Sequence, residues 1–299
     1  MRLDVAEREI KMSTVCAIIL DYFGSSKTIA CLMSLMDQEL DSVMIVDNSG
    51  DRQANQQLQE ALAIFSQKKA PFAMYQVVNP QNLGYALGVN NALRWLEKNQ
   101  PHDYYLLINN DAEATPDMLP QLLKFMNDHD RTALSAPVID TGDKQITCHW
   151  YQRLSGLLFS YHVIGTFPFL SGCCLLVNRQ IIKDALFDED FFMYGEDIAL
   201  AWHVKQSGWK SSFVRQARVR HEGTGSSQQG KLFYEYHLAR MHILLAKKLA
   251  KRRWEIPILY TGRLLTLSAR AVIRTVRYKS LIPLKASLLA IKKRNISNT

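Results

Sequence analysis

Several features that mark well-known protein classes are scarce or missing in this sequence. Its 299 residues include five cysteines, an odd number with no C-x-x-C pair, so neither a disulfide framework nor a zinc knuckle is indicated. The first 14 residues alternate in charge and contain no apolar core, so they do not form a secretory signal. Neither a Walker A loop nor a G-x-G-x-x-G fingerprint is present, which disfavours NAD chemistry. We therefore expect a protein of the cytoplasm.

Glycine and proline are also modest in number, at 14 and 9 residues, which excludes collagen-like and low-complexity chains. The hydrophobic share of 47% is enough to bury a sizeable core. The length fits one large α/β domain, or a catalytic domain with a small appendage.

Acidic residues are nearly absent from the last part of the chain. Residues 231–299 contain 16 Lys and Arg but only two acids, Glu235 and Glu255, whereas residues 1–230 contain 20 Lys and Arg and 26 Asp and Glu. The net charge of +8 is therefore a property of the tail.

One long stretch, residues 154–178, contains no charged side chain. It could cross a bilayer by length, but it includes His162, Pro168 and three glycines. That composition disfavours a transmembrane helix.

Short apolar runs alternate with amphipathic segments over the first half of the chain, which predicts a βαβα order. Runs without polar alternation suit strands covered on both faces, as in parallel sheets. Ligands of such sheets bind beyond the carboxyl ends of the strands. The runs at 15–20, 43–47, 75–79 and 104–109 end respectively in Asp21-Tyr22, Asp47-Asn48-Ser49, Asn79-Pro80-Gln81-Asn82 and Asn109-Asn110-Asp111. We expect these ends to form one polar crevice.

Four acidic or imidazole side chains suggest chemistry at that crevice. Asp111 follows an apolar strand, so it could bind Mg²⁺ or Mn²⁺ against a diphosphate, or it could simply stabilise a turn. Glu196 and Asp197 open a predicted helix after an apolar run, so they could stabilise its N-terminus or act as a partly desolvated base. His221 could be structural, or it could join Asp111 at a metal, with Thr224, Ser226 and Ser227 binding phosphate.

The ordered segments VCAIILDYFG, VMIVDNSG, NPQNLGYALGVNNAL, LLINNDAEATPDML, FLSGCCLLVNR, FFMYGEDIALAWHVKQSGW and RHEGTGSS resemble the successive motifs of family 2 glycosyltransferases. They are most similar to the rhamnosyltransferase-like branch and cover roughly residues 13–228. The resemblance implies a GT-A fold, an α/β Rossmann-like architecture with a mainly parallel sheet.

The resemblance also implies roles for particular residues. Nucleotide-sugar binding would fall to Asp21 or Tyr22, to Asp47, to Asn82 and Gly84, and to Asn109 and Asn110 of the D-x-D match. Asp111 would bind the metal, His221 the metal or diphosphate, and Asp197 of the Glu196-Asp197 pair would be the general base. Two departures are Asn109, which replaces the first carboxylate of D-x-D, and Phe23, where many members have Asn.

The implied reaction is the inverting, metal-dependent transfer of a sugar from a dTDP- or UDP-linked donor to a lipid-linked or polysaccharide acceptor. Among such donors, the resemblance points first to dTDP-rhamnose. The product would be a cell-envelope glycan such as an O-antigen of lipopolysaccharide. A nucleotidyltransferase, or a catalytically decayed scaffold that binds nucleotide sugars, remains an alternative, and Asn109 is the residue that favours the decayed form.

We expect two regions, a GT-A domain at 1–230 and a basic helical region at 231–299. Cations mixed with apolar residues in the tail predict helices lying on an anionic membrane surface at the cytoplasmic face. The other interpretation is ordinary helices packed on the domain. Nucleic-acid binding is disfavoured because no known module is present and residues 1–230 are acidic overall.

Overall fold

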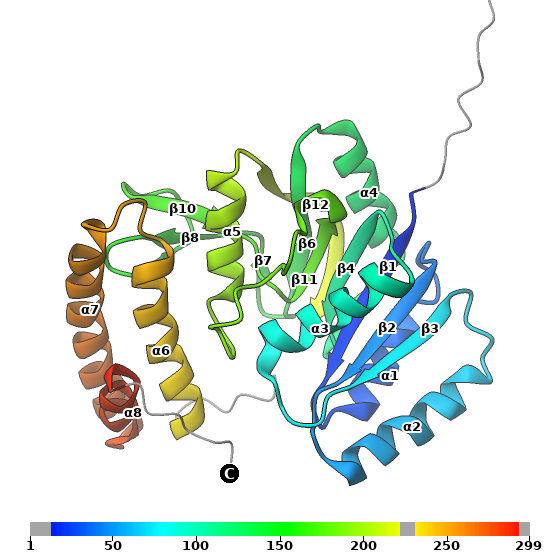
Figure 1. The fold of residues 1–299 in the computed structure, drawn as a ribbon, viewed down its shortest axis with the longest axis horizontal. Coiled ribbons are helices and arrows are strands. Elements are labelled where there is room, and N and C mark those ends of the chain that lie inside the picture. Colours follow the sequence, from blue (N-terminus) through cyan, green and yellow to red (C-terminus); the bar gives the residue numbers. More distant parts are fainter. Residues whose placement is uncertain (1–12, 222–230, 293–299) are drawn as a thin grey trace, which may run out of the picture.

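A computed structural model describes residues 13–221 and 231–292 of the chain. Within them, a large sheet has the strand order β3-β2-β1-β4-β11-β6-β12-β5, with β7 paired to β6, and a small sheet has the order β10-β8-β9. Figure 1 shows the large sheet flanked by helices, with three C-terminal helices standing beside the small sheet.

The strands are β1 (Val15–Asp21), β2 (Ser42–Asp47), β3 (Ala73–Val78), β4 (Tyr104–Asn109), β5 (Ala112–Ala114), β6 (Thr132–Asp140), β7 (Gln145–Ile146), β8 (His149–Gln152), β9 (Leu158–Phe159), β10 (Thr166–Phe169), β11 (Cys174–Asn178) and β12 (Lys210–His221). The helices are α1 (Ser25–Ser34), α2 (Arg52–Ser66), α3 (Gly84–Asn99), α4 (Met118–Asp128), α5 (Glu196–Gln206), α6 (Leu232–Lys248), α7 (Glu255–Tyr278) and α8 (Ile282–Ile291), with a 3-10 turn at Arg179–Ile181.

Both faces of the large sheet are covered, as its uninterrupted apolar strands predict. Along β1, Cys16 and Ile18 point to one core, and Val15, Ala17 and Ile19 point to the other. Residues of α3, α5 and α6 complete the first core, and residues of α1, α2 and α4 complete the second. The mainly parallel α/β architecture expected from the sequence is confirmed.

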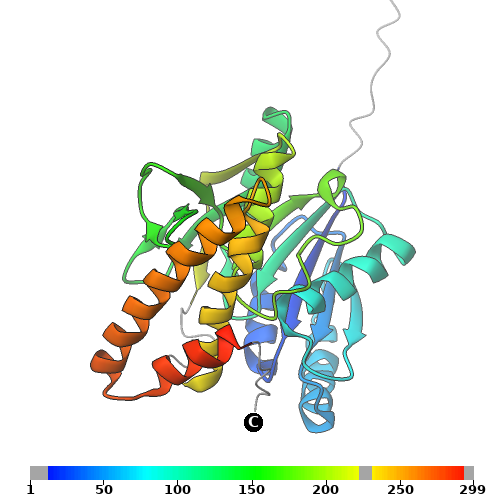
Figure 2. The same ribbon diagram turned by 60° about the vertical axis from the view of Figure 1, so that its left-hand side comes forward.

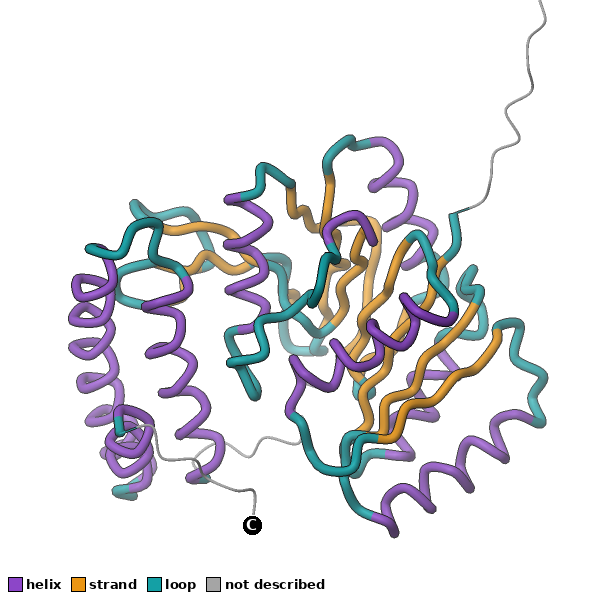
Figure 3. Tube along the Cα trace, viewed as in Figure 1, coloured by secondary structure: helices purple, strands orange, loops and turns teal. Residues whose placement is uncertain are grey.

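Strand direction brings the polar strand ends to one edge of the large sheet. Strands β1, β2, β3 and β4 are parallel, and Asp21 is in register with Asp47. Strands β6 and β12 run the same way, so Asp140 and His221 end at this edge too. Figure 3 shows the loops that leave β2 and β3 side by side there. We call this side of the sheet the carboxyl edge.

The Thr115-Pro116 pair is typical of a helix cap followed by proline at the first helical position, but the structure differs. Thr115 does not cap the following helix, because its Oγ donates to the carbonyl of Arg218 at 2.8 Å and α4 begins at Met118 behind Asp117. The uncharged stretch 154–178 holds the strands β9, β10 and β11, in agreement with the expectation that it does not form a transmembrane helix.

The tail is helical, as expected, and it packs on the domain. Met241, Leu245 and Leu249 of the α6 region belong to the core that also contains α3 and α5. Tyr236 and Leu267 join α8 residues in a smaller cluster of their own. Figure 2 shows α7 running across the outside of this bundle, with α8 at its lower end.

Candidate functional site

Asp21 anchors the first part of the carboxyl edge. Its side chain is 2% exposed and accepts hydrogen bonds from the Thr28 hydroxyl at 2.5 Å and from the Asn110 amide at 3.4 Å. Burial raises the pKa of Asp21, and the neighbouring hydrogen bonds oppose that effect. The loops after β1 and β4 are therefore joined through a buried carboxyl, with the Tyr22 ring beside them and packed edge-on to Phe23.

Asp47 and Asn48 organise the loop after β2. Asp47 accepts from the Ser49 backbone at 2.9 Å and from the Asn55 amide at 2.6 Å, so its 1% exposed carboxylate is held by α2 and its own turn. Asn48 accepts from the Asn79 amide at 3.0 Å and donates to the Asn82 side chain at 3.2 Å. These bonds lock the loops after β2 and β3 together.

Gly84 lies where the loop after β3 meets the loop before α5. Its φ is +76°, and a Cβ there would lie 2.1 Å from the Phe192 carbonyl oxygen, so this position requires glycine. Asn82 accepts from the Gly84 backbone at 2.9 Å, and Tyr85 donates its backbone N–H to Phe192 at 2.8 Å. The start of α3 is thereby fixed against the segment that leads to Glu196.

Asp111 and His221 come together although 110 residues separate them. Imidazole Nε2 lies 3.1 Å from the Asp111 Oδ1, because β12 ends beside the short strand β5. Burial raises the pKa of Asp111, but the hydrogen bond and charge of His221, with the charge of Lys27, outweigh it. The pKa of Asp111 is therefore below its ordinary value, and this carboxyl is ionised at neutral pH.

The pair lines a pocket of about 300 Å³. Its other lining residues are Glu113, Asp140, Thr141, Gly142 and Arg220. Sequence reasoning did not select Asp140, although it ends the apolar run 133–140 and the strand-end rule would have found it. Among residues 13–221 and 231–292, no cluster of three or more His, Cys, Asp or Glu side chains is arranged to hold a metal ion.

Glu196 and Asp197 open α5 behind a strained turn. Tyr194 and Gly195 have φ values of +66° and +92°, and a Cβ on Gly195 would collide with Met241 of α6. Within the described residues, the buried Glu196 Oε2 has no hydrogen-bond partner. Burial raises the pKa of both carboxyls, and for Glu196 the neighbouring Asp197 adds to this effect.

The turn before β11 links the acidic pair to the Asp111 side of the site. Tyr85 donates its hydroxyl to the Gly172 carbonyl at 3.1 Å, and Gly172 lies against Asp197. The next residue, Cys173, accepts from the Asn109 backbone N–H at 2.8 Å. The D-x-D match and Asp197 therefore flank one turn at the carboxyl edge.

Within the described residues, the site residues predicted from the sequence lie at or beside the carboxyl edge. Asp21, Tyr22 and Asn110 form one group, Asp47, Asn82 and Gly84 a second, and Asp111, His221, Asn109 and the pair Glu196-Asp197 line the remainder. Their catalytic and binding roles stay predictions. The predicted phosphate ligands Thr224, Ser226 and Ser227 lie outside the described residues. Thr28 and Asn48, which position this edge, were not selected from the sequence as site residues.

The carboxyl edge of this α/β sheet therefore carries two buried acids, the Asp111–His221 pair and the acidic pair that opens α5. A family model described as glycosyl transferase family 2 matches residues 17–186. The chain belongs to that family. The resemblance drawn from the sequence motifs is confirmed.

A curated relative supports the rhamnosyltransferase-like branch of this family. N-acetylglucosaminyl-diphospho-decaprenol L-rhamnosyltransferase of Mycobacterium tuberculosis, in strains H37Rv and CDC 1551, is 28% identical over 216 residues. The match covers 61% of this chain and 69% of the relative.

Solved structures share the fold at low identity. The mannosyltransferase PcManGT from Pyrobaculum calidifontis, in complex with GDP-Man and Mn²⁺, has a TM-score of 0.60 at 14% identity, covering 95% of this chain and 88% of that one. GalNAc-T7 with UDP, GalNAc and Mn²⁺ has a TM-score of 0.58 at 15% identity, over 78% of this chain and only 48% of its own length. S. aureus TarS 1-349 has a TM-score of 0.54 at 12% identity, over 95% and 93%. The GT-A fold expected from the resemblance is confirmed.

Proposed function

We propose that this protein is an inverting glycosyltransferase that moves a sugar from a nucleotide-sugar donor to a lipid-linked or polysaccharide acceptor. The observation that carries the proposal is the placement of the Asp111–His221 pair and of Asp197 on either side of the Gly172-Cys173 turn. One group can stabilise the departing diphosphate while the other activates the attacking hydroxyl.

The nucleoside part of the donor would lie along the edge from Asp47 to Asp21. Asp21, Tyr22 and Asp47 would contact the base and ribose, and Asn82 and Gly84 would hold the nucleotide near the start of α3. Both aspartates are preorganised by hydrogen bonds from Thr28, Asn110, Ser49 and Asn55. This rigidity supports a binding role, because little side-chain freedom would be lost on donor binding.

The residues at the pocket fit a divalent metal that also takes ligands from the donor. Asp111 is ionised and His221 presents Nε2 beside it, and Mg²⁺ sites commonly use one or two protein ligands with substrate phosphates. When bound, Mg²⁺ or Mn²⁺ supplies positive charge that stabilises the leaving nucleoside diphosphate. Asn109 and Asn110 would contribute neutral polar contacts next to Asp111.

Asp197 would act as the general base. Its raised pKa makes the carboxylate a better proton acceptor than a solvated aspartate, which suits abstraction of the acceptor hydroxyl proton. The sugar carbon then forms its bond to that oxygen on the face opposite the departing diphosphate. Glu196 would act beside it and keep the site acidic and poorly hydrated.

The donor and acceptor are proposed from the branch. The mycobacterial relative is named as a rhamnosyltransferase for an N-acetylglucosaminyl-diphospho-decaprenol acceptor. Its name favours dTDP-rhamnose as the donor, with UDP-linked sugars as the second choice. It also favours a lipid-linked glycan as the acceptor. Synthesis of a cell-envelope glycan such as the O-antigen of lipopolysaccharide would fit this chemistry.

We propose a GT-A domain at 1–230 and a membrane-associating region at 231–299 that keeps the enzyme on the cytoplasmic face of an anionic membrane. Nucleic acid is not a proposed partner.

A catalytically decayed nucleotide-sugar-binding scaffold is the second candidate, because Asn109 removes one carboxylate from the D-x-D match. A nucleotidyltransferase would use a similar crevice but would release pyrophosphate. Both alternatives predict nucleotide binding, so only product analysis separates them from the transferase.

The first experiment is a thermal-shift screen of the full chain with dTDP, UDP, GDP and CMP, each with and without Mn²⁺. A ligand that binds only the folded state raises the unfolding temperature. We expect stabilisation by dTDP or UDP that increases with Mn²⁺ and is reduced in Asp111→Ala. No shift with any nucleotide would contradict the proposed donor site.

A further inference from the structure

Helix α7 presents an uncharged face to solvent. Its exposed residues recur at helical spacing, and the large ones among them are strongly exposed, with Leu265 at 70% and Val276 at 74%. We define the α7 outer face by the residues Ile258, Thr261, Leu265, Ser268, Ala269, Val272, Ile273 and Val276. The opposite side of the helix buries Leu259, Arg263, Leu267 and Ala271.

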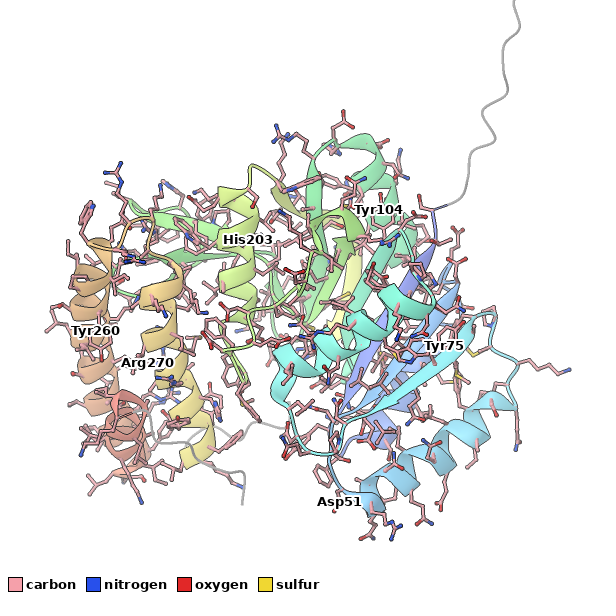
Figure 4. The ribbon with its side chains drawn as sticks, viewed as in Figure 1. Asp51, Tyr75, Tyr104, His203, Tyr260 and Arg270 are labelled. Carbon is pink, nitrogen blue, oxygen red and sulfur yellow. The ribbon has the colours of Figure 1, made fainter. Side chains whose placement is uncertain are left out.

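The cations of α7 do not lie on this face. Arg263 is 1% exposed and donates to the Tyr151 hydroxyl at 2.6 Å and to the Arg153 carbonyl at 2.8 Å. Arg274 is paired with the buried Glu235 of α6. Figure 4 shows Arg270 between α7 and α6. Three arginines of α7, namely Arg263, Arg270 and Arg274, therefore contact partners within the bundle rather than the solvent-facing side of the helix.

Exposed cations instead gather at the two ends of the α7 outer face. Lys251, Arg252 and Arg253 precede the helix, and Arg277 and Lys279 stand at its far end. The 24 residues of α7 give the helix a length of roughly 36 Å. An apolar strip of this length with cations at both ends matches a helix lying in the interface of a bilayer, where apolar side chains enter and cations meet the headgroups.

The exposed apolar surface continues beyond α7. Leu281 at the start of α8 is 72% exposed and Leu288 is 59% exposed. Leu154, at 42%, lies against Gly262 of α7. In Figure 1, α8 lies at the lower left and the loops after β2 and β3 lie at the lower right of centre, so both are on the lower side in that view.

We infer that the α7 outer face, with Leu281 and Leu288, docks in the plane of a lipid bilayer, and that the flanking cations add a preference for anionic headgroups. The inference rests on the proposed function in one respect, since a lipid-linked acceptor requires an enzyme at the membrane surface. Insertion is driven chiefly by apolar burial, and the charges tune it.

Two other occupants fit less well. Among the described helices, α7 alone is long and apolar enough to span a membrane by length and composition. A spanning orientation, however, would remove Arg263 from Tyr151 and Arg274 from Glu235 and place both cations in hydrocarbon. A second copy of the chain would have to pair the cationic ends of one α7 with those of another, which adds repulsion at the rim in a parallel or antiparallel arrangement.

The test is flotation of the full chain with phosphatidylcholine vesicles, with and without phosphatidylglycerol, at low and high salt. We expect the wild type to float with both and to bind the anionic vesicles more tightly at low salt. The double variant Leu265→Glu, Val276→Glu should reduce binding at least about tenfold at either salt concentration, because two exposed apolar side chains that would enter the bilayer are lost. Arg252→Gln with Arg253→Gln should weaken only the binding to anionic vesicles at low salt.

Ile64→Glu is the matched control, because Ile64 is 66% exposed on α2, outside the C-terminal bundle, and its substitution should leave flotation unchanged. Failure of the wild type to bind either vesicle, or equal binding by the double variant, would overturn the inference. So would a wild-type dimer, measured by light scattering without lipid, that the double variant converts to monomer. Sugar transfer to a water-soluble acceptor separates the membrane proposal from the proposed enzyme activity. The double variant should keep this transfer activity. If the wild type lacks the activity, only the proposed glycosyltransferase function is contradicted.

Discussion

At the scale of single residues, the proposed sugar transfer depends on a few carboxyl groups that the fold places in different surroundings. Asp111 has an imidazole partner and a lowered pKa, whereas Asp197 is enclosed at the start of α5 and has a raised pKa. This contrast assigns charge stabilisation to the first group and proton transfer to the second.

Asp197→Asn should lower the transfer rate by about 10²–10⁴-fold, because the acceptor hydroxyl loses its base. Donor affinity should stay close to wild type. The substitution should not destabilise the protein at neutral pH, since a raised carboxyl pKa means that the ionised form opposes folding there. Product release and donor titration measure both effects, and retention of most activity would remove Asp197 from this role.

The pH profile follows from the same group. Because burial raises the pKa of Asp197 above its ordinary 3.8, the carboxylate is protonated as pH falls through that raised value, and the base is lost. As the pH is lowered, the transfer rate should therefore begin to fall at a higher pH than it would if the base were an exposed aspartate. A rate that stays constant down to the ordinary pKa of aspartate would contradict an enclosed base.

Asn109 offers a gain-of-function test of the metal site. Asn109→Asp would restore the first carboxylate of the D-x-D match and should lower the Mn²⁺ concentration for half-maximal donor binding, on the order of tenfold. A matched control is Asn127→Asp, which adds the same charge on α4 away from the carboxyl edge. An unchanged or higher metal requirement in Asn109→Asp would show that this side chain does not face the metal.

Sequence reasoning located most of the candidate site residues because they follow apolar strands, and strand direction then fixes their edge. It did not select Asp140, which the same rule would have found at the end of the run 133–140, or Thr28, which needs pairing information. Thr28 matters only because it bonds to Asp21. The partnership of His221 with Asp111 was one of two interpretations that the residues left open, and the family resemblance favoured it over a structural histidine.

At the scale of elements, the loop before α5 connects three parts of the molecule. Phe192 contacts Gly84 and stacks on His237 of α6 at 4.8 Å between ring centroids, and Lys248 of α6 pairs with Asp188 and Asp190 of the same loop. The segment that carries Glu196 and Asp197 is therefore held by α3 on one side and by the tail on the other.

Gly84→Ala should lower the free energy of unfolding by more than about 2 kcal/mol, since it combines positive φ with a backbone collision. Gly142→Ala is the control, because Gly142 has φ +81° but nothing within 4 Å of its Cβ position, so only backbone strain remains, about 1 kcal/mol. Equal effects of the two substitutions in denaturant unfolding would contradict the collision.

Element bounds were predictable where periodicity is strong and less so at caps. Asp117, rather than Thr115, precedes α4 because Thr115 is recruited by β12, a partner more than 100 residues away. The basic pattern of α7 predicted a cationic surface, but buried partners such as Tyr151 and Glu235 turn its arginines inward. Neither partner is visible in local sequence.

At the scale of the whole molecule, a buried polar network fastens the tail to the domain. Arg263 reaches Tyr151 of β8 and the carbonyls of Arg153 and His242, and Arg153 lies over the Trp202 ring of α5 at 4.6 Å. The C-terminal helices are thus packed on the transferase domain, and the βαβα pattern of residues 15–128 could not predict this arrangement because its contacts are non-local.

Arg263→Met should destabilise the whole protein by about 2–4 kcal/mol, because it leaves the Tyr151 hydroxyl and two carbonyls without their buried donor. Arg277→Met, at an exposed position of the same helix, should change the free energy of unfolding by no more than about 0.5 kcal/mol. Denaturant unfolding of both variants measures this, and similar small effects would mean that the network does not hold the tail.

The central claim is that the carboxyl edge transfers a sugar from a nucleotide donor. The most direct measurement incubates the full chain with dTDP-rhamnose, Mn²⁺ and a diphospho-polyprenol-linked N-acetylglucosamine acceptor, and follows both released nucleotide and extended acceptor. We predict equimolar dTDP and rhamnosylated acceptor from the wild type, and at least about 100-fold slower formation of both with Asp197→Asn. Should the protein bind dTDP yet release nothing from any dTDP- or UDP-sugar, or release pyrophosphate instead, the transferase account would be wrong.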